Sequence, residues 1–307
     1  MNMPKQVVIE QATKVAGYFK LEVIRADGTI KSTHEFKNLV LNAGLDRWAI
    51  NTADGFCHVG TGSATPAITD VALQTKIATT GTGISNTTTV QGSSPYYNQN
   101  TRVYQFAAGV AAGNLTEIGI GWNTTQLFSR ALIVDSGGSP TTLTILATEI
   151  LNVTYIFRAY PPTADNTVSV TISGTSYTIV SRPSLVTNIN FWSAPTLTNG
   201  LNTNNNNVSQ PATYPSTSTL GAVTSAPSGT QLACPSTAYS WATYTNGNYY
   251  LDITISLGVA DGNSAGGIGA MSIQPRSGAY QLSFSPAIPK DSTKTFILTV
   301  RHFFTRH

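Results

Sequence analysis

The sequence predicts a mainly β protein with two β-sandwich-like domains and one or two short helices in the N-terminal part. Three observations support this prediction. Segments of β-branched or alternating residues, separated by Gly, Asn, Ser and Pro, recur along the chain. The 307 residues are enough for two cores of ordinary size. The consecutive prolines Pro161 and Pro162 cannot donate ladder hydrogen bonds, so we place a boundary there, between domains 1–162 and 163–307.

The first predicted element is a hairpin. Residues 18–25 and 29–36 form two alternating runs around the dipeptide Asp27-Gly28. Both residues of this dipeptide tolerate positive φ, which suits a tight turn between antiparallel strands. We therefore expect the two runs to pair with each other.

A short amphipathic helix is predicted next, within the segment NLVLNAGLDRWAI. Its apolar residues are spaced by three and four positions, which fits one face of a helix. These residues are Leu41, Leu45, Trp48 and Ala49.

The segment VGTGSATPAITDVALQTKIA, residues 59–78, predicts a strand end, a Gly-rich turn and a second short helix. Pro66 lies near the expected start of this helix, where proline is well tolerated. The apolar positions of the expected helix are Val71, Leu73 and Ile77.

From about residue 96 onward the pattern predicts strands. Before the boundary they are the segments NTRVYQFAAG, LTEIGIGW, LFSRALIV and LTILATEILNVTYIFRAY. After it, TVSVTISGTSYTIV predicts a hairpin around Ser173-Gly174, and the later strands are YYLDITISLGVA, AYQLSFSPAI and KTFILTVRHFF. The tract from Asn202 to Asn207 predicts a loop, because Asn favours turns over ladder pairing.

Charged residues are unusually scarce, which excludes several classes of protein. Asp, Glu, Lys and Arg make up 10% of the chain, against about 25% in ordinary proteins. Arg182 is the only charged residue from 166 to 251. The net charge of +3 comes from scattered residues, so no nucleic-acid partner is predicted. No apolar run of about 18 residues occurs, so no membrane insertion is predicted either.

No catalytic residue, metal site or cofactor is predicted. The fourteen acids are thinly spread, without a spacing that brings two of them together. Cys57 and His58 could bind a metal only with distant partners, and we expect Cys57 and Cys234 to be free buried thiols. The Gly-rich segments VGTGSATP and TTGTGIS lack the Lys-Ser/Thr ending of a phosphate loop, so we interpret them as turns.

Aromatic residues of the second half suggest a binding hypothesis. The segments NINFWSAP and YSWATYTNGNYY mix Trp, Tyr and Asn, which stack on sugar rings and hydrogen-bond to hydroxyl groups. The candidate ligand or interface aromatics are Trp192, Trp241, Tyr244 and Tyr249. In the alternative interpretation, the two tryptophans fill the second core and the tyrosines cover its rim.

The order of motifs resembles that of structural proteins from tailed bacteriophages, in the tail, baseplate, collar and fibre-attachment group. In that group an N-terminal hairpin precedes an N-x-G-L-D helix, a V-G-T-G-x-x-x-P turn, a D-x-x-L helix and an E-I-G-(I/L) strand. This chain has NAGLD at 42–46, VGTGSATP at 59–66, DVAL at 70–73 and EIGI at 117–120. The resemblance covers residues 17–160 well and the last 30 residues loosely.

The resemblance implies a non-enzymatic virion component that is assembled in the host bacterial cytoplasm. It also implies a homo-oligomer, as a ring or trimer, that contacts other virion proteins of the tail or neck. An uncharged surface suits burial between subunits, because burying an unpaired charge is costly. Two alternatives stay open. One is a tail adhesin that binds a host receptor or surface glycan through the aromatics, and the other is a polysaccharide depolymerase. The depolymerase would need at least two acids in one groove, from Asp252, Asp261 and Asp291.

Overall fold

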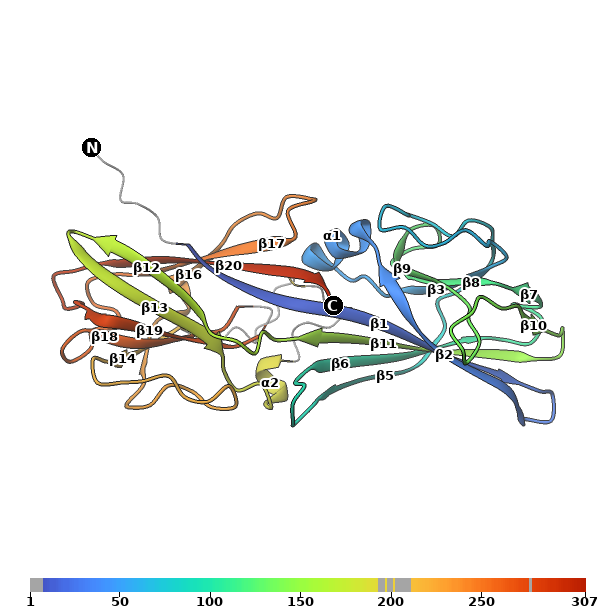
Figure 1. The fold of residues 1–307 in the computed structure, drawn as a ribbon, viewed down its shortest axis with the longest axis horizontal. Helices are drawn as coiled ribbons and strands as arrows, with labels where there is room; N and C mark the ends of the chain where they lie inside the picture. Colours follow the sequence, from blue (N-terminus) through green and yellow to red (C-terminus); the bar gives the residue numbers. More distant parts are fainter. Residues whose placement is uncertain (1–7, 193–196, 198–200, 202–210, 276–277) are drawn as a thin grey trace.

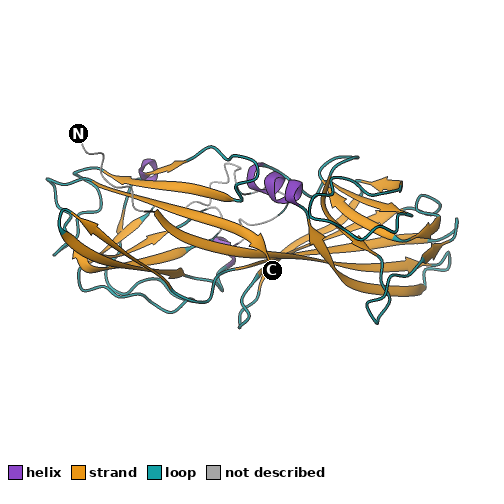
Figure 2. Ribbon diagram, turned by 45° about the horizontal axis from the view of Figure 1, so that its top comes forward, coloured by secondary structure: helices purple, strands orange, loops and turns teal. Residues whose placement is uncertain are grey.

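The computed structural model describes residues 8–192, 197, 201, 211–275 and 278–307. The described chain is mainly β and elongated, with two lobes that follow each other along the long axis (Figure 1). Its helices are short, and strands form the body of both lobes (Figure 2). This confirms the predicted fold class of a mainly β protein with two sandwich-like parts.

The N-terminal lobe has two layers of strands. Its elements are β1 (Val8–Ile24), β2 (Ile30–Val40), α1 (Asn42–Ile50), β3 (Phe56–Gly60), β4 (Lys76–Thr80), β5 (Gly83–Val90), β6 (Asn98–Phe106), β7 (Gly113–Leu115), β8 (Glu117–Gly121), β9 (Leu127–Leu132), β10 (Leu143–Ile145) and β11 (Ile150–Tyr160). One layer has the order β2-β1-β11-β6-β5 and the other β9-β8-β3-β4. The last residues of β2 pair with β9 and so join the two layers.

The C-terminal lobe is also built from two layers. Its elements are β12 (Asn166–Ile172), β13 (Thr175–Pro183), α2 (Ile189–Trp192), β14 (Ala212–Pro215), β15 (Leu232–Ala233), η1 (Ser236–Ala238), β16 (Tyr239–Trp241), β17 (Tyr250–Leu257), β18 (Ile268–Ile273), β19 (Tyr280–Ile288) and β20 (Phe296–Arg306). One layer continues the long sheet in the order β16-β17-β20-β1, and the other has the order β12-β13-β19-β18-β14-β15. The Asn-rich tract from Asn202 to Asn207, which we predicted as a loop, lies outside the described residues.

Strand β1 belongs to both lobes. Its residues 14–24 pair antiparallel with β11, and its residues 8–15 pair parallel with β20. Lys14 and Val15 pair with both strands, so β11 and β20 lie on opposite edges of β1. The boundary that we predicted near residue 162 falls between β11 and β12. However, the lobes are not two consecutive stretches of chain, because the start of β1 completes the C-terminal lobe.

Both predicted hairpins and the first predicted helix are present. In the turn between β1 and β2, Gly28 has φ +84° and the backbone N–H of Thr29 donates to Asp27 Oδ1 at 2.9 Å. Ser173 and Gly174 have φ values of 49° and 81° between β12 and β13, as a tight hairpin turn requires. Helix α1 buries the apolar face that its spacing predicted.

The prediction of a second helix is wrong. Residues 61–75 form turns and bends, and the strand β4 begins at Lys76. Of the three expected apolar positions only Leu73 is buried, whereas Val71 and Ile77 are exposed. The physical reason is tertiary, because backbone N–H groups at both ends of this segment donate to the buried carboxylate of Glu117. A side chain distant in sequence therefore overrides a local helical spacing.

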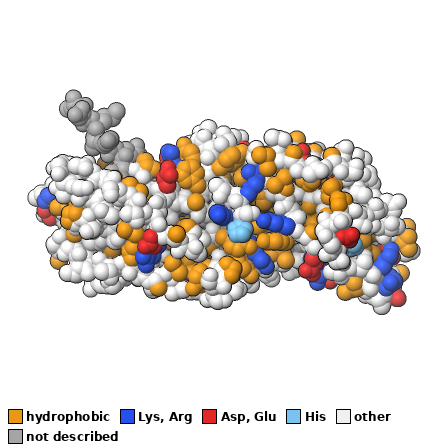
Figure 3. All heavy atoms as spheres, in the orientation of Figure 1, with side chains coloured by type: hydrophobic (Ala, Val, Ile, Leu, Met, Phe, Trp, Pro, Cys, Tyr) orange, Lys and Arg blue, Asp and Glu red, His pale blue; other side chains and the backbone are white. Residues whose placement is uncertain are grey.

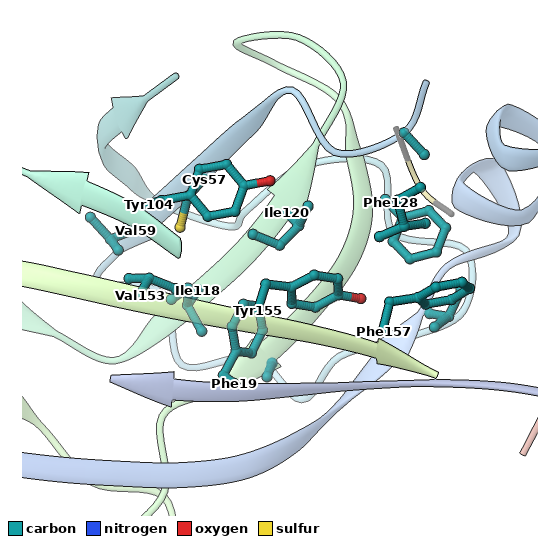
Figure 4. Packing of buried hydrophobic residues seen from close by; sticks show 14 of the residues in the cluster. Phe19, Cys57, Val59, Tyr104, Ile118, Ile120, Phe128, Val153, Tyr155 and Phe157 are labelled. Atoms are coloured by element: carbon teal, nitrogen blue, oxygen red, sulfur yellow. The ribbon is translucent and has the colours of Figure 1, made fainter. Parts of the chain in front are cut away.

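Each lobe has its own hydrophobic core, and the core of the N-terminal lobe also includes Leu251 and Phe304 from the second half of the chain. Figure 4 shows the N-terminal core, where Tyr155 and Phe157 of β11 point toward residues of the facing layer such as Phe128. The ring centroids of Phe128 and Phe157 lie 5.6 Å apart. Trp48 of α1 contacts Phe157 at 5.3 Å and Phe304 of β20 at 5.7 Å. Trp48 therefore packs elements of both halves of the chain together.

Candidate functional site

Several of the sequence motifs, NAGLD at 42–46, VGTGSATP at 59–66, DVAL at 70–73 and EIGI at 117–120, meet at the loop 61–75, which we call the pinned loop. Glu117, at the start of β8, is fully buried beneath it. Glu117 Oε1 accepts the backbone N–H groups of Gly62 at 3.0 Å and Thr75 at 2.7 Å, and Oε2 accepts that of Gln74 at 3.0 Å. One carboxylate therefore holds both ends of the loop.

Arg130 of β9 compensates the buried charge of Glu117. Its Nε and Nη2 atoms donate to Glu117 Oε2 at 3.0 Å and 2.8 Å. The same guanidinium donates to Asp70 Oδ2 at 2.6 Å and to the Ala64 carbonyl at 3.0 Å. A buried carboxylate is tolerated when a partner and further hydrogen bonds satisfy it, and this one is satisfied on all sides. The ends and the middle of the pinned loop are thus tied to two buried side chains.

Glycine explains why the loop can approach Glu117 so closely. A Cβ atom at Gly62 would clash with Glu117 Oε1, and one at Gly60 would clash with the Thr75 carbonyl oxygen. The Gly-Thr-Gly sequence of the motif therefore has a steric role here, and phosphate binding is not needed to account for it.

The outer surface of the pinned loop is almost uncharged, and two branched apolar side chains are exposed on it among Ala, Ser, Thr and Gln residues. Ile68 and Val71 are 45% and 55% exposed. Their carbonyl groups are anchored from behind by the backbone N–H groups of Asn42, at 2.8 Å, and Leu127, at 2.9 Å. The only charged residue of the loop, Asp70, is paired with Arg130. The loop is therefore held in place by buried groups while it exposes two branched apolar side chains.

The exposed face of the long sheet offers a second surface. Charged side chains are sparse over the view in Figure 3, and several Lys and Arg side chains lie near its middle, around a histidine. On the strands of this sheet, the guanidinium of Arg158 lies 4.4 Å from the ring centroid of Tyr97 and 5.0 Å from that of Tyr18. The rings of Tyr160 and His307 lie 4.4 Å apart. Burial, followed by the hydrogen bond with Tyr18, raises the pKa of Tyr160 to about 12, so its hydroxyl stays protonated near neutral pH.

The two tryptophans predicted as binding residues lie in different environments. Trp192 is buried in the C-terminal core, where its Nε1–H donates to the Ser184 carbonyl at 2.9 Å and its ring lies 5.8 Å from Tyr280. A buried ring cannot stack on a ligand, so the position of Trp192 matches the core interpretation. Trp241 of β16 is half-buried, with its ring 6.4 Å from that of Tyr239.

The two predicted tyrosines lie at the junction of the lobes. The Tyr244 hydroxyl donates to Asp46 Oδ1 of α1 at 2.6 Å, and the Tyr244 ring lies 6.0 Å from Phe304. The Tyr249 backbone N–H donates to the Tyr244 hydroxyl at 3.4 Å, and the Tyr249 carbonyl accepts from the Phe304 N–H at 2.9 Å. Both tyrosines therefore make contacts within the chain, between the C-terminal half and helix α1 or β20. Sequence reasoning missed Asp46 as their partner, because this acid lies in the other half of the sequence.

The acids considered for catalysis have separate local partners. Asp252 forms an ion pair with Arg301 at 2.8 Å, Asp261 accepts the Gly258 N–H at 3.0 Å, and Asp291 accepts the Thr293 N–H at 2.9 Å. Within the described residues, no three His, Cys, Asp or Glu side chains gather in a group that could hold a metal ion.

The two cysteines, Cys57 and Cys234, are free and buried as we expected, and burial raises the pKa of both thiols. In the part of the chain that the structure describes, no helix is long and apolar enough to cross a membrane.

The chain matches no protein-family model, no curated protein and no solved structure. Its function is therefore inferred from its fold, its surfaces and the order of its motifs.

Proposed function

We propose that the protein is a non-enzymatic structural component of a tailed-phage particle. It assembles through protein–protein contacts in the tail, baseplate, or neck and collar, where it can also attach fibres. One observation carries this proposal. The motifs that resemble phage structural proteins converge on a single unit, in which Glu117 and Arg130 hold the exposed pinned loop. Motifs that are dispersed in sequence thus serve one structural purpose, the presentation of a docking surface.

The surface chemistry supports assembly. Ile68 and Val71 are exposed on a loop whose single charge is already paired, so a partner can cover them without stripping water from a free charge. The scarcity of charged residues in the second half has the same consequence for the other lobe. We propose a symmetric homo-oligomer, as a ring or trimer, that also contacts other virion proteins.

The two alternative functions have less support. A glycan-binding adhesin built on both tryptophans is disfavoured, because Trp192 is in the core. A depolymerase needs two cooperating carboxylates, whereas Asp252, Asp261 and Asp291 each have separate partners.

Light scattering on the purified protein at two salt concentrations tests the proposal. We expect an oligomer whose mass does not depend on salt, because its interfaces are apolar and uncharged. The protein should also be detected in purified particles of the phage that encodes it. A monomer at both salt concentrations, together with absence from the particles, would contradict the proposal.

A pair of variants tests the role of the pinned loop. Ile68→Asp with Val71→Asp places charges on the proposed docking surface, and we expect at least a tenfold loss of incorporation into particles. Val259→Asp is the matched control, since Val259 is a comparably exposed apolar residue of the other lobe, at 47%. Equal incorporation of both variants would show that the loop is not a docking surface.

A further inference from the structure

Strand β5 is an open edge of the long sheet. Among the described strands it pairs only with β6, and it is the outermost strand of its layer (Figure 1). The residues from Gly83 to Thr87 are all exposed, and Ile84 is 51% exposed. An edge strand presents main-chain N–H and C=O groups that can pair with another strand.

The direction of these main-chain groups follows from the neighbouring ladder. Gln105 donates its N–H to the Thr82 carbonyl, and Gln91 donates its N–H to the Tyr97 carbonyl. Odd-numbered residues of β6 therefore direct their main chain toward β5, and in register they face odd-numbered residues of β5. In an antiparallel ladder, successive residues direct their main-chain N–H and C=O groups to opposite sides of the strand. Thr88 and the other even-numbered residues of β5 therefore direct these groups outward, away from β6.

This edge lacks the features that usually prevent edge-to-edge pairing. Natural edge strands are protected by charged residues, by proline or by very short length. The segment 77–101, which contains β5, has no Asp, Glu, Lys or Arg, and β5 has no proline. The other edge strands at the ends of the two large sheets differ. Strand β4 carries Lys76, β15 and β16 have only two and three residues, and Asp165, directly before β12, forms an ion pair with Arg182 of β13.

We propose that β5 pairs antiparallel with β5 of a second copy of this chain, about a two-fold axis at Thr87. A second copy is the occupant that the charge pattern fits. An uncharged strand meets its own copy without repulsion and has no charge with which to select a charged partner. The ladder restricts the axis to the position of a residue, since opposite residues must both direct their main chain outward or both inward. The axis at Thr87 keeps the paired residues beyond the bulge between Gly83 and Ser85.

Single cysteine variants test this geometry. A residue on the axis lies opposite its own copy at a Cα separation of about 4.5 Å in a non-hydrogen-bonded pair, which allows a disulfide. Thr87→Cys should therefore form a covalent dimer under a mild oxidant. Thr89→Cys is the matched control, because it points to the same face but lies opposite Ser85 of the second copy. Cys57 and Cys234 are buried, so the unsubstituted protein should give little background.

Charge substitutions give a second test, which does not depend on a covalent crosslink. Thr87→Lys places two like charges opposite each other, and we expect the dimer dissociation constant to rise about twofold to fivefold. Mixing Thr87→Lys with Thr87→Glu should restore dimerisation, since opposite charges then face each other across the axis. Failure of Thr87→Cys to crosslink, or equal crosslinking of Thr89→Cys, would overturn the pairing.

The inference rests on the proposed function in one respect, namely that the protein acts by assembling. The two can fail separately. An oligomer that enters particles without a Thr87 crosslink would overturn the β5 pairing and leave the structural role intact. A β5 dimer that is absent from particles would overturn the structural role and leave the pairing intact.

Discussion

Tyr244 donates a hydrogen bond from its hydroxyl to Asp46 Oδ1 at 2.6 Å, across 198 positions of sequence. The backbone N–H of Gly247 donates to the same oxygen at 2.7 Å. Asp46 therefore binds a loop of the C-terminal half to helix α1 of the N-terminal half. With the contact of Trp48 and Phe304, this joint holds the two lobes in one arrangement.

The Tyr244→Phe substitution should weaken this joint. It removes only the hydroxyl, and we expect the free energy of unfolding to fall by about 1.5–3 kcal/mol, the usual contribution of a hydrogen bond to a charged group. Urea denaturation measures this loss. In a double-mutant cycle with Asp46→Ala, the two losses should be non-additive, because the residues contact each other. Additive losses would contradict a direct interaction.

Arg130→Met should lower the free energy of unfolding much more than Arg301→Met does. It leaves Glu117 buried without its charged partner, so we expect a loss of about 3–5 kcal/mol. Arg301 pairs with Asp252 at a half-buried position of the sheet face, and its loss should cost about 1 kcal/mol or less. Chemical denaturation compares the two. Limited proteolysis of Arg130→Met should also cleave within the pinned loop, whereas equal stability of the two variants would contradict the role of Glu117.

Acid should destabilise the protein through two buried histidines. Burial lowers the pKa of His302 to about 3, and burial with the nearby charge of Lys76 lowers that of His58 to about 4. In the unfolded chain both bind a proton near pH 6.5, so their stabilising effect is complete above that pH and is lost as the pH falls toward 4. At pH 5 each histidine should lower the free energy of unfolding by about 2 kcal/mol relative to pH 7.

Denaturation curves between pH 7 and pH 4 measure this effect. His302→Phe, which keeps an aromatic ring beside Tyr280, should flatten the pH dependence of the free energy of unfolding. A slope unchanged by this substitution would contradict the assignment.

Alanine substitutions of Trp192 and Trp241 should differ in their effect on the free energy of unfolding. Trp192→Ala creates a cavity in the C-terminal core and should cost about 3–5 kcal/mol. Trp241→Ala removes a half-buried ring at the edge strand β16 and should cost clearly less. Thermal unfolding measures both. If Trp241→Ala abolished adsorption to host cells while the fold stayed intact, the adhesin hypothesis would gain support over the structural proposal.

Elements whose information is local were predictable. The β1–β2 hairpin combines period-two alternation with Asp27-Gly28, and the β12–β13 hairpin does the same at Ser173-Gly174. Helix α1 has a clear apolar face around Trp48. Strand β18, by contrast, was not predicted, because the Gly-rich sequence around Ile268 and Met271 has little strand character of its own and is ordered by its neighbours β14 and β19.

The candidate site was predictable as a set of motifs and not as a structure. The sequence contains Glu117 in EIGI and Arg130 in LFSRALIV, each a lone charge within an apolar strand. That pairing of opposite lone charges was the available signal, since buried charges require partners. It was missed because nothing in the local sequence shows that β8 and β9 are neighbours.

The sequence by itself determined the mainly β class, the turns, the first helix and the uncharged surface, because each depends on neighbouring residues or on overall composition. Only the tertiary structure decided that residues 66–77 would not be helical, that β1 would serve both lobes and that Trp192 would be core. The physical reason is the same in each case. Buried charges, strand partners and core positions are set by contacts between segments far apart in the chain, and these contacts outweigh local preference.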